Sequence, residues 1–127
     1  MAISSRGWRE VPLAVVDVET TGLHPAGDRI VEIAIVRLEP ESREPRVVLD
    51  TLVNPGRRVT ATEIHGITDD DVRDAPPFPA LAPAVVQALH GAMFASYNVY
   101  FDAKFVGAEL ERAGCRRFPP HLCLMYM

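Results

Sequence analysis

Two carboxylates, Asp17 and Glu19, lie two residues apart at the end of an apolar run near the N-terminus. The preceding residues 13–16, Leu-Ala-Val-Val, predict a strand that is buried on both faces. Side chains at positions i and i+2 of a strand point to the same face, so we expect these carboxylates side by side. Charges placed there are costly unless they are paired or hold a metal. With no Lys or Arg between them, the pair favours a hard cation such as Mg²⁺ or Mn²⁺.

A third carboxylate, Asp102, follows another predicted strand across a short turn. Ligands of α/β sheets gather beyond the carboxyl ends of the strands. If the strands that precede Asp17 and Asp102 are parallel neighbours, three carboxylates converge and repel each other until cations neutralise them. Two divalent ions about 3.5–4 Å apart are the usual solution, one activating a water and both stabilising the charge that develops on a phosphodiester. The residues therefore indicate phosphodiester chemistry.

The composition is that of an ordinary globular domain. The 127 residues fit one domain, with 48% hydrophobic residues, 24% charged residues and a net charge of −4. No basic stripe indicates a nucleic-acid binder, although acidic metal ligands would inflate the negative count. The two cysteines show no zinc-ligand spacing. Because no signal-peptide pattern and no run of 18 apolar residues occurs, we expect a cytoplasmic protein without a membrane partner.

The predicted elements follow the order β-β-β-α-β-α-β. Strands are expected over residues 13–18, 29–38, 46–53, 93–97 and 121–127, and the main helices over residues 80–90 and 101–113. Shorter helices are expected within residues 59–66, capped by Thr60 or Thr62, and after a cap at Thr68. Three strands with short connections predict an antiparallel meander, and the later helices predict parallel crossovers. The fold class is therefore α/β, a mixed sheet flanked by helices.

Three segments together resemble the motifs of a known family. They are Asp17 to Leu23 (DVETTGL), Ile64 to Thr68 (IHGIT) and Asn98 to Asp102 (NVYFD). In this order and spacing they resemble the DEDDh, DnaQ-like superfamily of 3′–5′ exonucleases, and most nearly the epsilon-like proofreading exonucleases of bacterial DNA polymerase III. The resemblance covers the chain from about Leu13 to its end. It implies an RNase H-like fold and a single exonuclease domain over residues 1–127.

The resemblance also implies roles for individual residues. Asp17, Glu19 and Asp102 would be catalytic and would hold two Mg²⁺ ions, with Mn²⁺ as an alternative. The implied substrate-binding residues are Thr20, Thr21, Leu23, His65, Asn98 and Phe101, the last two supporting the second motif. Leu23 would be an apolar wedge against the terminal base. The implied partners are a DNA 3′ end, single-stranded or frayed, and a DNA polymerase subunit.

Two departures from the family pattern matter. The family often has His where this chain has Tyr97, which we interpret as a branch-specific difference. The family's third motif, a His followed five residues later by an Asp on a last helix, is absent after Asp102, since Tyr126 follows His121 at that spacing. The chain also stops within an apolar run. We therefore expect a domain that is incomplete at its C-terminus and lacks the last helix.

The absent third motif should weaken catalysis. In the family its His is the general base, and positioned bases contribute typically about 10²–10⁴-fold to the rate. Its Asp is the fourth carboxylate, so the affinity for metal should fall as well. The 127-residue chain alone is therefore expected to show weak or no nuclease activity.

Other functions stay open on the sequence alone. One is an RNA-directed exonuclease of the same superfamily, because contacts to the 2′-hydroxyl are few. Another is a non-catalytic module that binds nucleic acid or a polymerase, which the absent third motif favours and the intact Asp17, Glu19 and Asp102 oppose. The run of three acidic residues at positions 69–71 is interpreted as a solvated helix N-terminus, not a metal cluster.

Overall fold

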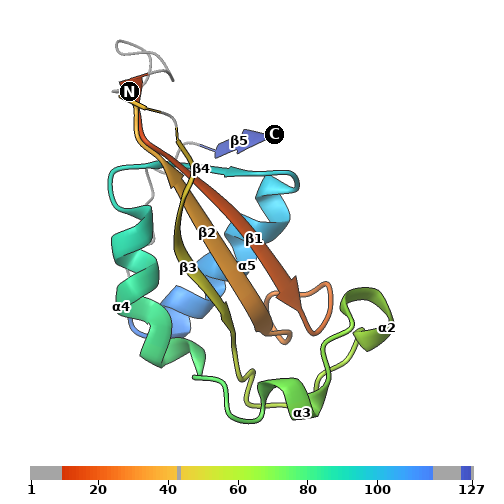
Figure 1. The fold of residues 1–127 in the computed structure, drawn as a ribbon. Coiled ribbons are helices and arrows are strands. Elements are labelled where there is room, and N and C mark those ends of the chain that lie inside the picture. Colours follow the sequence, from red (N-terminus) through yellow and green to blue (C-terminus); the bar gives the residue numbers. More distant parts are fainter. Residues whose placement is uncertain (1–9, 43, 116–123, 127) are drawn as a thin grey trace.

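The computed structural model describes residues 10–42, 44–115 and 124–126 (Figure 1). Its elements are β1 (Leu13–Thr20), β2 (Ile30–Leu38), β3 (Arg46–Leu52), α2 (Thr62–His65), α3 (Asp69–Val72), α4 (Phe78–Leu89), β4 (Met93–Ser96), α5 (Val99–Arg112) and β5 (Leu124–Tyr126). The strands form one sheet in the order β3-β2-β1-β4-β5. β1, β2 and β3 pair antiparallel, whereas β4 is parallel to both β1 and β5. The predicted mixed sheet, a meander followed by parallel strands, is confirmed.

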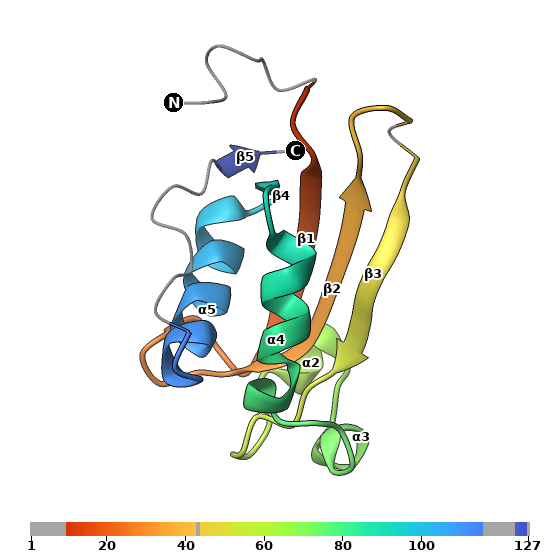
Figure 2. The same ribbon diagram turned by 90° about the vertical axis from the view of Figure 1, so that its left-hand side faces the viewer.

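Helices α4 and α5 pack on one face of this sheet, and Figure 2 shows both on the same side of the strands. Within β1, Val16 and Val18 point toward these helices and are 2% and 6% exposed. Asp17, between them, is exposed on the opposite face, which we call the open face of the sheet. The expectation that the first strand is buried on both faces is therefore wrong. Helices α4 and α5 cover only the inner face of β1, so β1 alternates between buried and open positions.

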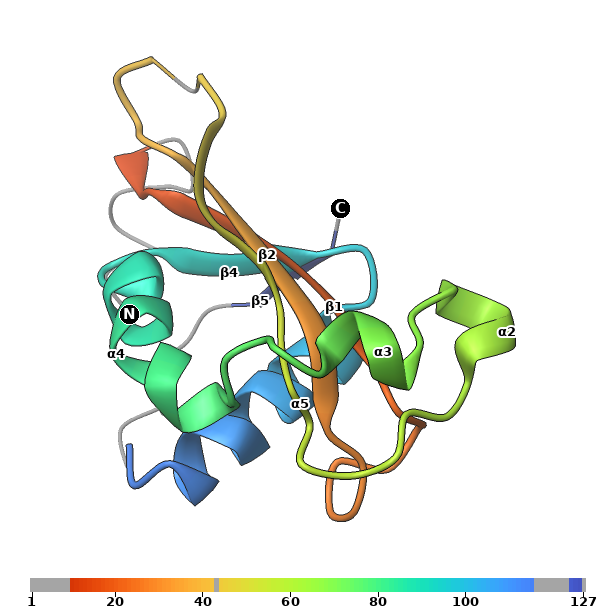
Figure 3. The same cartoon turned by 60° about the horizontal axis from the view of Figure 1, so that its bottom comes forward.

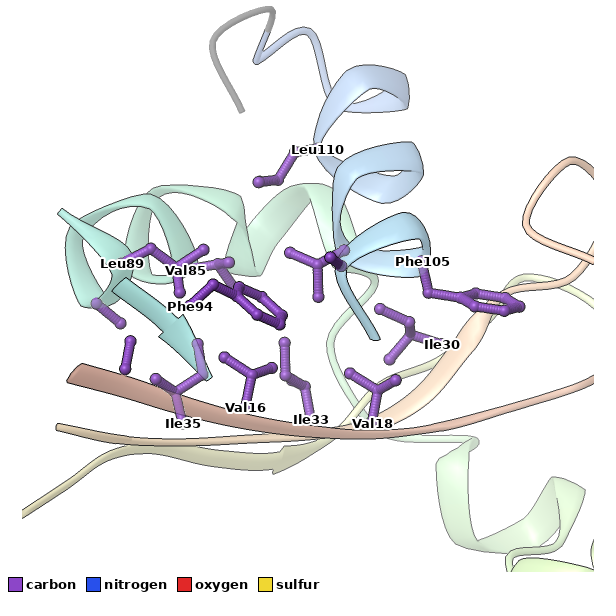
Figure 4. Close-up of a cluster of buried hydrophobic side chains, with 14 of the residues drawn as sticks. Val16, Val18, Ile30, Ile33, Ile35, Val85, Leu89, Phe94, Phe105 and Leu110 are labelled. Atoms are coloured by element: carbon purple, nitrogen blue, oxygen red, sulfur yellow. The ribbon is translucent and has the colours of Figure 1, made fainter. Parts of the chain in front are cut away.

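The core lies between the inner face of the sheet and the two long helices. Figure 4 shows its side chains from β1, β2, α4, β4 and α5 pointing toward one another. The largest fully buried members are Phe78, Phe94, Phe105, Ile30, Ile33, Ile35 and Leu110. Truncating one of the buried phenylalanines to Ala would cost about 3–5 kcal/mol, because lost transfer energy adds to a cavity term. This core fixes α5 against β1 and β2.

β1 and β4 pair over a short distance and then separate. The parallel register joins only Leu13–Val15 to Met93–Ala95, although β1 continues along β2 as far as Thr20. In Figure 1, β4 runs beside the first part of β1, while β1 continues to the end of the sheet near α2. Beyond Ala95 the edge of β1 that faces β4 is therefore open to a side chain from another element.

Two helix starts differ from the predictions because of backbone conformation at their caps. α4 begins at Phe78, two residues early, since Pro77 is extended with ψ 157° and Pro79 fits the first helical turn. α5 begins at Val99, two residues before its predicted start, so Asp102 lies within the first turn of the helix. Both shifts are within the usual uncertainty of helix boundaries.

The short helices lie at the end of the sheet where β1 ends and β2 begins, as Figure 3 shows. The predicted caps of α2 are wrong: its N-cap is Ala61, with φ 63°, and no side chain caps it. The hydroxyls of Thr60 and Thr62 instead donate to the carbonyls of Thr21 and Ile67. The cap at Thr68 is confirmed, because Thr68 and Asp71 form a reciprocal capping box.

The predicted C-terminal strand is described in part. Of residues 121–127, positions 124–126 form β5, and the others, including Cys123, lie outside the described residues. No helix in the described part of the chain combines the length and apolar character needed to cross a bilayer.

Candidate functional site

Asp17 and Glu19 lie side by side on the open face of β1, as predicted from their spacing. Both belong to the strand itself, which extends two residues beyond its predicted end. Directly across the ladder, Glu19 is paired with Glu32 of β2. Like charges directly opposite each other destabilise a sheet. The Glu19 and Glu32 carboxylates therefore repel each other on this face of the sheet.

The pKa of Glu32 reports this repulsion. Burial raises it, and the carboxylates of Asp50, Glu19 and Asp17 raise it further, whereas His65 lowers it. Glu32 and Asp50 lie on β2 and β3, so the acidic region spans three strands. It is most crowded where β1 carries two carboxylates.

Asp102 reaches β1 through the opening between β1 and β4. Its side chain is only 5% exposed, and its carboxylate accepts hydrogen bonds from the Ser96 hydroxyl and from the backbone N–H of Val18. Burial raises the pKa of Asp102 to about 6; the two hydrogen bonds oppose this rise, and the charges of Asp17 and Glu19 add to it. The structure therefore brings the three predicted carboxylates into one electrostatic environment.

No cation within the described residues compensates Asp102 in the form of an ion pair. Nor do any three His, Cys, Asp or Glu side chains in that part of the chain converge tightly enough to count as a metal site. At this edge of the sheet the candidate ligands are Asp17, Glu19 and Asp102. The donors are all hard carboxylate oxygens, and they fit a divalent cation such as Mg²⁺, which takes few protein ligands and keeps several waters.

The hydroxyls of Thr20 and Thr21 form hydrogen bonds to other residues of the same loop. Thr20 donates to the carbonyl of Gly22 at 2.6 Å. Thr21 donates to Asp28 at 2.8 Å and accepts from the Arg29 N–H at 3.0 Å. Their side chains are 7% and 2% exposed, so a ligand at this loop would meet backbone atoms before these hydroxyls.

The loop between β1 and β2 requires a glycine. A Cβ on Gly22 would lie 2.5 Å from the carboxylate of Asp28. That carboxylate also accepts from the His24 N–H and pairs with Arg57, both at 3.1 Å. Burial opposes ionisation of Asp28, but these donors and charges outweigh it and lower the pKa. The contacts hold Leu23 at the tip of the loop, where it is 74% exposed.

His65 is fixed by its own loop. Its Nδ1 accepts from the Ile67 N–H at 3.0 Å, and its Nε2 contacts the carbonyl of Thr60 at 3.1 Å. With Nδ1 accepting, the proton lies on Nε2, so both ring nitrogens are used. His65 can present only its partly exposed ring to a ligand.

Asn98 and Phe101 flank the start of α5. Asn98 is exposed, and its backbone N–H donates to the Ser96 hydroxyl at 3.2 Å. Phe101 packs against the core and contacts Phe105, with ring centroids 4.8 Å apart. Phe101 thus packs within the helix that carries Asp102.

Three polar residues of this region were not recognised in the sequence. Glu109 is fully buried and binds Arg29 at 2.6 Å and the Ile30 N–H at 3.0 Å. Its signal is a spacing of seven from Asp102, which places both on one helix face. Glu32 is the one acidic residue of β2, and Ser96 is the one polar residue of β4. A polar residue in an apolar strand is therefore the signal that could have found them.

A family model described as Exonuclease (RNase_T) matches residues 14–127. The chain belongs to the DnaQ-like exonucleases of the DEDDh superfamily. Within this family it is 40% identical over 103 residues to the 3′-5′ exonuclease DinG of Bacillus subtilis, covering 79% of this chain and 11% of that protein. It is 41% identical over 108 residues to the DNA polymerase III subunit epsilon-like protein of Rhodobacter capsulatus, covering 83% and 15%. The exonuclease chain thus spans only a small part of these relatives.

Solved structures confirm the RNase H-like fold. Exonuclease I in its apo form superposes with a TM-score of 0.75 at 24% identity, over 92% of this chain and 29% of that one. E. coli Exonuclease I in complex with a 5cy-dA13 oligonucleotide gives a TM-score of 0.74 at 24% identity, over 91% and 28%. At this identity the similarity shows the fold alone.

Proposed function

We propose that this chain is the exonuclease domain of a metal-dependent 3′–5′ exonuclease that hydrolyses the terminal phosphodiester of DNA and releases nucleoside monophosphates. One observation carries the proposal: Asp102 is 5% exposed, without an ion pair among the described residues, and the charges of Asp17 and Glu19 raise its pKa. A cation between these carboxylates would remove the repulsion. The polarity is supported by the name of the relative from Bacillus subtilis, a 3′-5′ exonuclease.

Asp17, Glu19 and Asp102 would hold two divalent cations, Mg²⁺ or Mn²⁺. When bound, such cations supply a nucleophile from water at neutral pH and stabilise charge on the phosphate. The oxygen of water would bond to the terminal phosphorus while the bond to the 3′ oxygen of the penultimate nucleotide breaks. The 3′ oxygen takes up a proton to become a hydroxyl, and the terminal nucleotide leaves as a monophosphate.

The neighbouring residues would position the 3′ end. Leu23, 74% exposed, is proposed to contact the terminal base, while Thr20 and Thr21 hold its loop in place. The exposed side chain of Asn98 and the ring of His65 are proposed to line the path of the strand.

Metal binding tests the proposal most directly. A ligand at 100 times its Kd stabilises a protein by about 2.7 kcal/mol. We expect Mn²⁺ to raise the thermal unfolding midpoint of the wild-type chain, and Asp17→Ala and Asp102→Asn to remove this shift. Asp74→Asn, an exposed carboxylate outside the site, is the matched control. A shift that survives in Asp17→Ala would refute the assignment.

Release of nucleotides from a labelled single strand tests the activity. Residues 1–127 alone should turn over weakly, because no His followed five residues later by an Asp occurs after Asp102. Robust turnover by this chain would mean that another group serves as general base. Equal or faster rates on a matched RNA oligonucleotide would favour the RNA-directed alternative, and binding without any metal-dependent cleavage in a longer form of the protein would favour a non-catalytic module.

A DNA polymerase is the proposed partner. Support comes from the names of relatives: the epsilon-like protein of Rhodobacter capsulatus and the DNA polymerase III PolC-type of Caldanaerobacter subterraneus, which is 30% identical over 107 residues. Co-elution of the protein with the polymerase of its own organism would support this partner, and separate elution at micromolar concentration would argue against a stable complex.

A further inference from the structure

Ser96 is a buried hydroxyl that none of the sequence motifs includes. It is the last residue of β4 and is 1% exposed. Its Oγ donates to Oδ2 of Asp102 and accepts from the N–H of Asn98 at 3.2 Å. Both the donor and an acceptor position of the hydroxyl are therefore used, and both contacts go to the segment that begins α5.

Ser96 lies at the point of the sheet where β1 and β4 stop pairing. Pairing of β1 with β4 ends at Val15 and Ala95, so Ser96 is the first residue of β4 beyond the shared ladder. At this point the carboxylate of Asp102 connects the two strands, because it accepts from Ser96 on one side and from the N–H of Val18 on the other. Val18 lies between Asp17 and Glu19, so this bridge sets where Asp102 lies relative to both.

We propose that Ser96 is a positioning residue of the exonuclease site, whose hydroxyl fixes the Asp102 carboxylate between β1 and β4 beside Asp17 and Glu19. The inference rests on the proposed function, since it assigns Ser96 a role toward the same cations. Ser96 acts through Asp102, because its buried hydroxyl already has a donor and an acceptor partner. Outer contacts of this kind orient metal ligands, and losing one typically lowers metal affinity by about 10–100-fold.

The test compares three variants by calorimetric titration with Mn²⁺ on the 127-residue chain. Ser96→Ala removes the hydroxyl and should weaken Mn²⁺ binding by about 10–100-fold. Ser96→Thr keeps a hydroxyl and should restore most of the affinity. Thr51→Ala is the matched control, because it removes a hydroxyl from β3 that donates only to the carbonyl of Leu52, at 2.8 Å.

Unfolding measurements separate positioning from simple stabilisation. If Ser96 only supports the turn at Asn98, Ser96→Ala lowers the urea midpoint but binds Mn²⁺ like the wild type when folded, and the inference is overturned. Should the added methyl of Ser96→Thr prevent folding at this buried position, Ser96→Ala and Thr51→Ala decide the question alone.

Asp102→Asn separates this inference from the proposed function. If wild type binds Mn²⁺ and Asp102→Asn does not, while Ser96→Ala matches the wild type, only the role of Ser96 is refuted. If Asp102→Asn binds Mn²⁺ as well as wild type, or wild type binds none, both proposals are refuted.

Discussion

Helix α5 carries two buried carboxylates in opposite electrostatic environments. Asp102 is 5% exposed and Glu109 is 1% exposed, and their spacing of seven residues places them on one face of the helix. Glu109 pairs with Arg29 at 2.6 Å and with Arg112 at 3.4 Å. Within the described residues, Asp102 has only the Ser96 hydroxyl and a backbone N–H as donors, and it faces two like charges.

The difference separates a carboxylate paired within the chain from the one that we propose binds a cation. A buried charge costs several kcal/mol, and a partner within the chain offsets that cost for Glu109. For Asp102 the described part of the chain supplies hydrogen bonds but no counter-charge. A carboxylate that the fold buries and leaves uncompensated is expected where a cation completes the site.

The largest expected change in stability comes from removing the paired carboxylate of Glu109. Glu109→Ala should lower the free energy of unfolding by about 3–5 kcal/mol, because it leaves the buried Ile30 N–H and the Arg29 guanidinium without their acceptor. Urea unfolding at pH 7 measures it. Glu111→Ala, an exposed carboxylate on the same helix, should change stability by no more than about 0.5 kcal/mol. Similar effects from both variants would show that Glu109 is not a structural ion-pair partner.

The second prediction is a gain in the free energy of unfolding, on replacing the buried carboxylate of Asp102. The folded-state pKa of Asp102 is raised from 3.8 to about 6, so its ionisation costs stability as pH rises from about 4 to about 6. In the presence of a chelator, Asp102→Asn should therefore be more stable than wild type at pH 7 by about 2–3 kcal/mol. The difference should shrink as pH falls and vanish toward about pH 3, below both pKa values, where the wild-type carboxyl is mostly protonated in both states.

Urea unfolding at several pH values in chelator checks this pattern. Saturating Mg²⁺ should reduce or reverse the order at pH 7, because only the wild-type carboxylate binds it. A pH-independent difference between Asp102→Asn and wild type would contradict an uncompensated charge at this position.

A smaller effect concerns the loop that ends at Arg29, the partner of Glu109. Gly22→Ala would place a Cβ 2.5 Å from the Asp28 carboxylate, whose contacts hold that loop. We expect a loss of about 1–3 kcal/mol in the free energy of unfolding, typical of an overpacked site. Gly27→Ala is the matched control, because a Cβ there meets no atom within 4 Å. Equal thermal midpoints for the two variants would show that the loop adapts freely.

The features that depended on local spacing could be predicted from the sequence. The i, i+2 spacing placed Asp17 and Glu19 on one face of β1, as the structure shows. Thr68 followed by three acidic residues predicted a cap that the structure contains. Each of these inferences needs only a few neighbouring residues and a regular backbone.

The contacts that decide the site's electrostatics join distant positions. Arg29 and Glu109 are 80 residues apart, and nothing near either one predicts the pair. Whether β1 is covered on one face or two depends on where α4 and α5 pack, so the exposure of Asp17 could not be predicted from its own segment. The left-handed conformation of Ala61 likewise follows from the loop around it and not from its residue type.

Because β1 and β4 stop pairing at Val15 and Ala95, no backbone hydrogen bonds join these two strands where Asp17, Glu19 and Asp102 lie. The three carboxylates could therefore move toward a bound ion without breaking hydrogen bonds between β1 and β4. The width of the site is thus set by side chains, while the paired strands on either side keep their geometry.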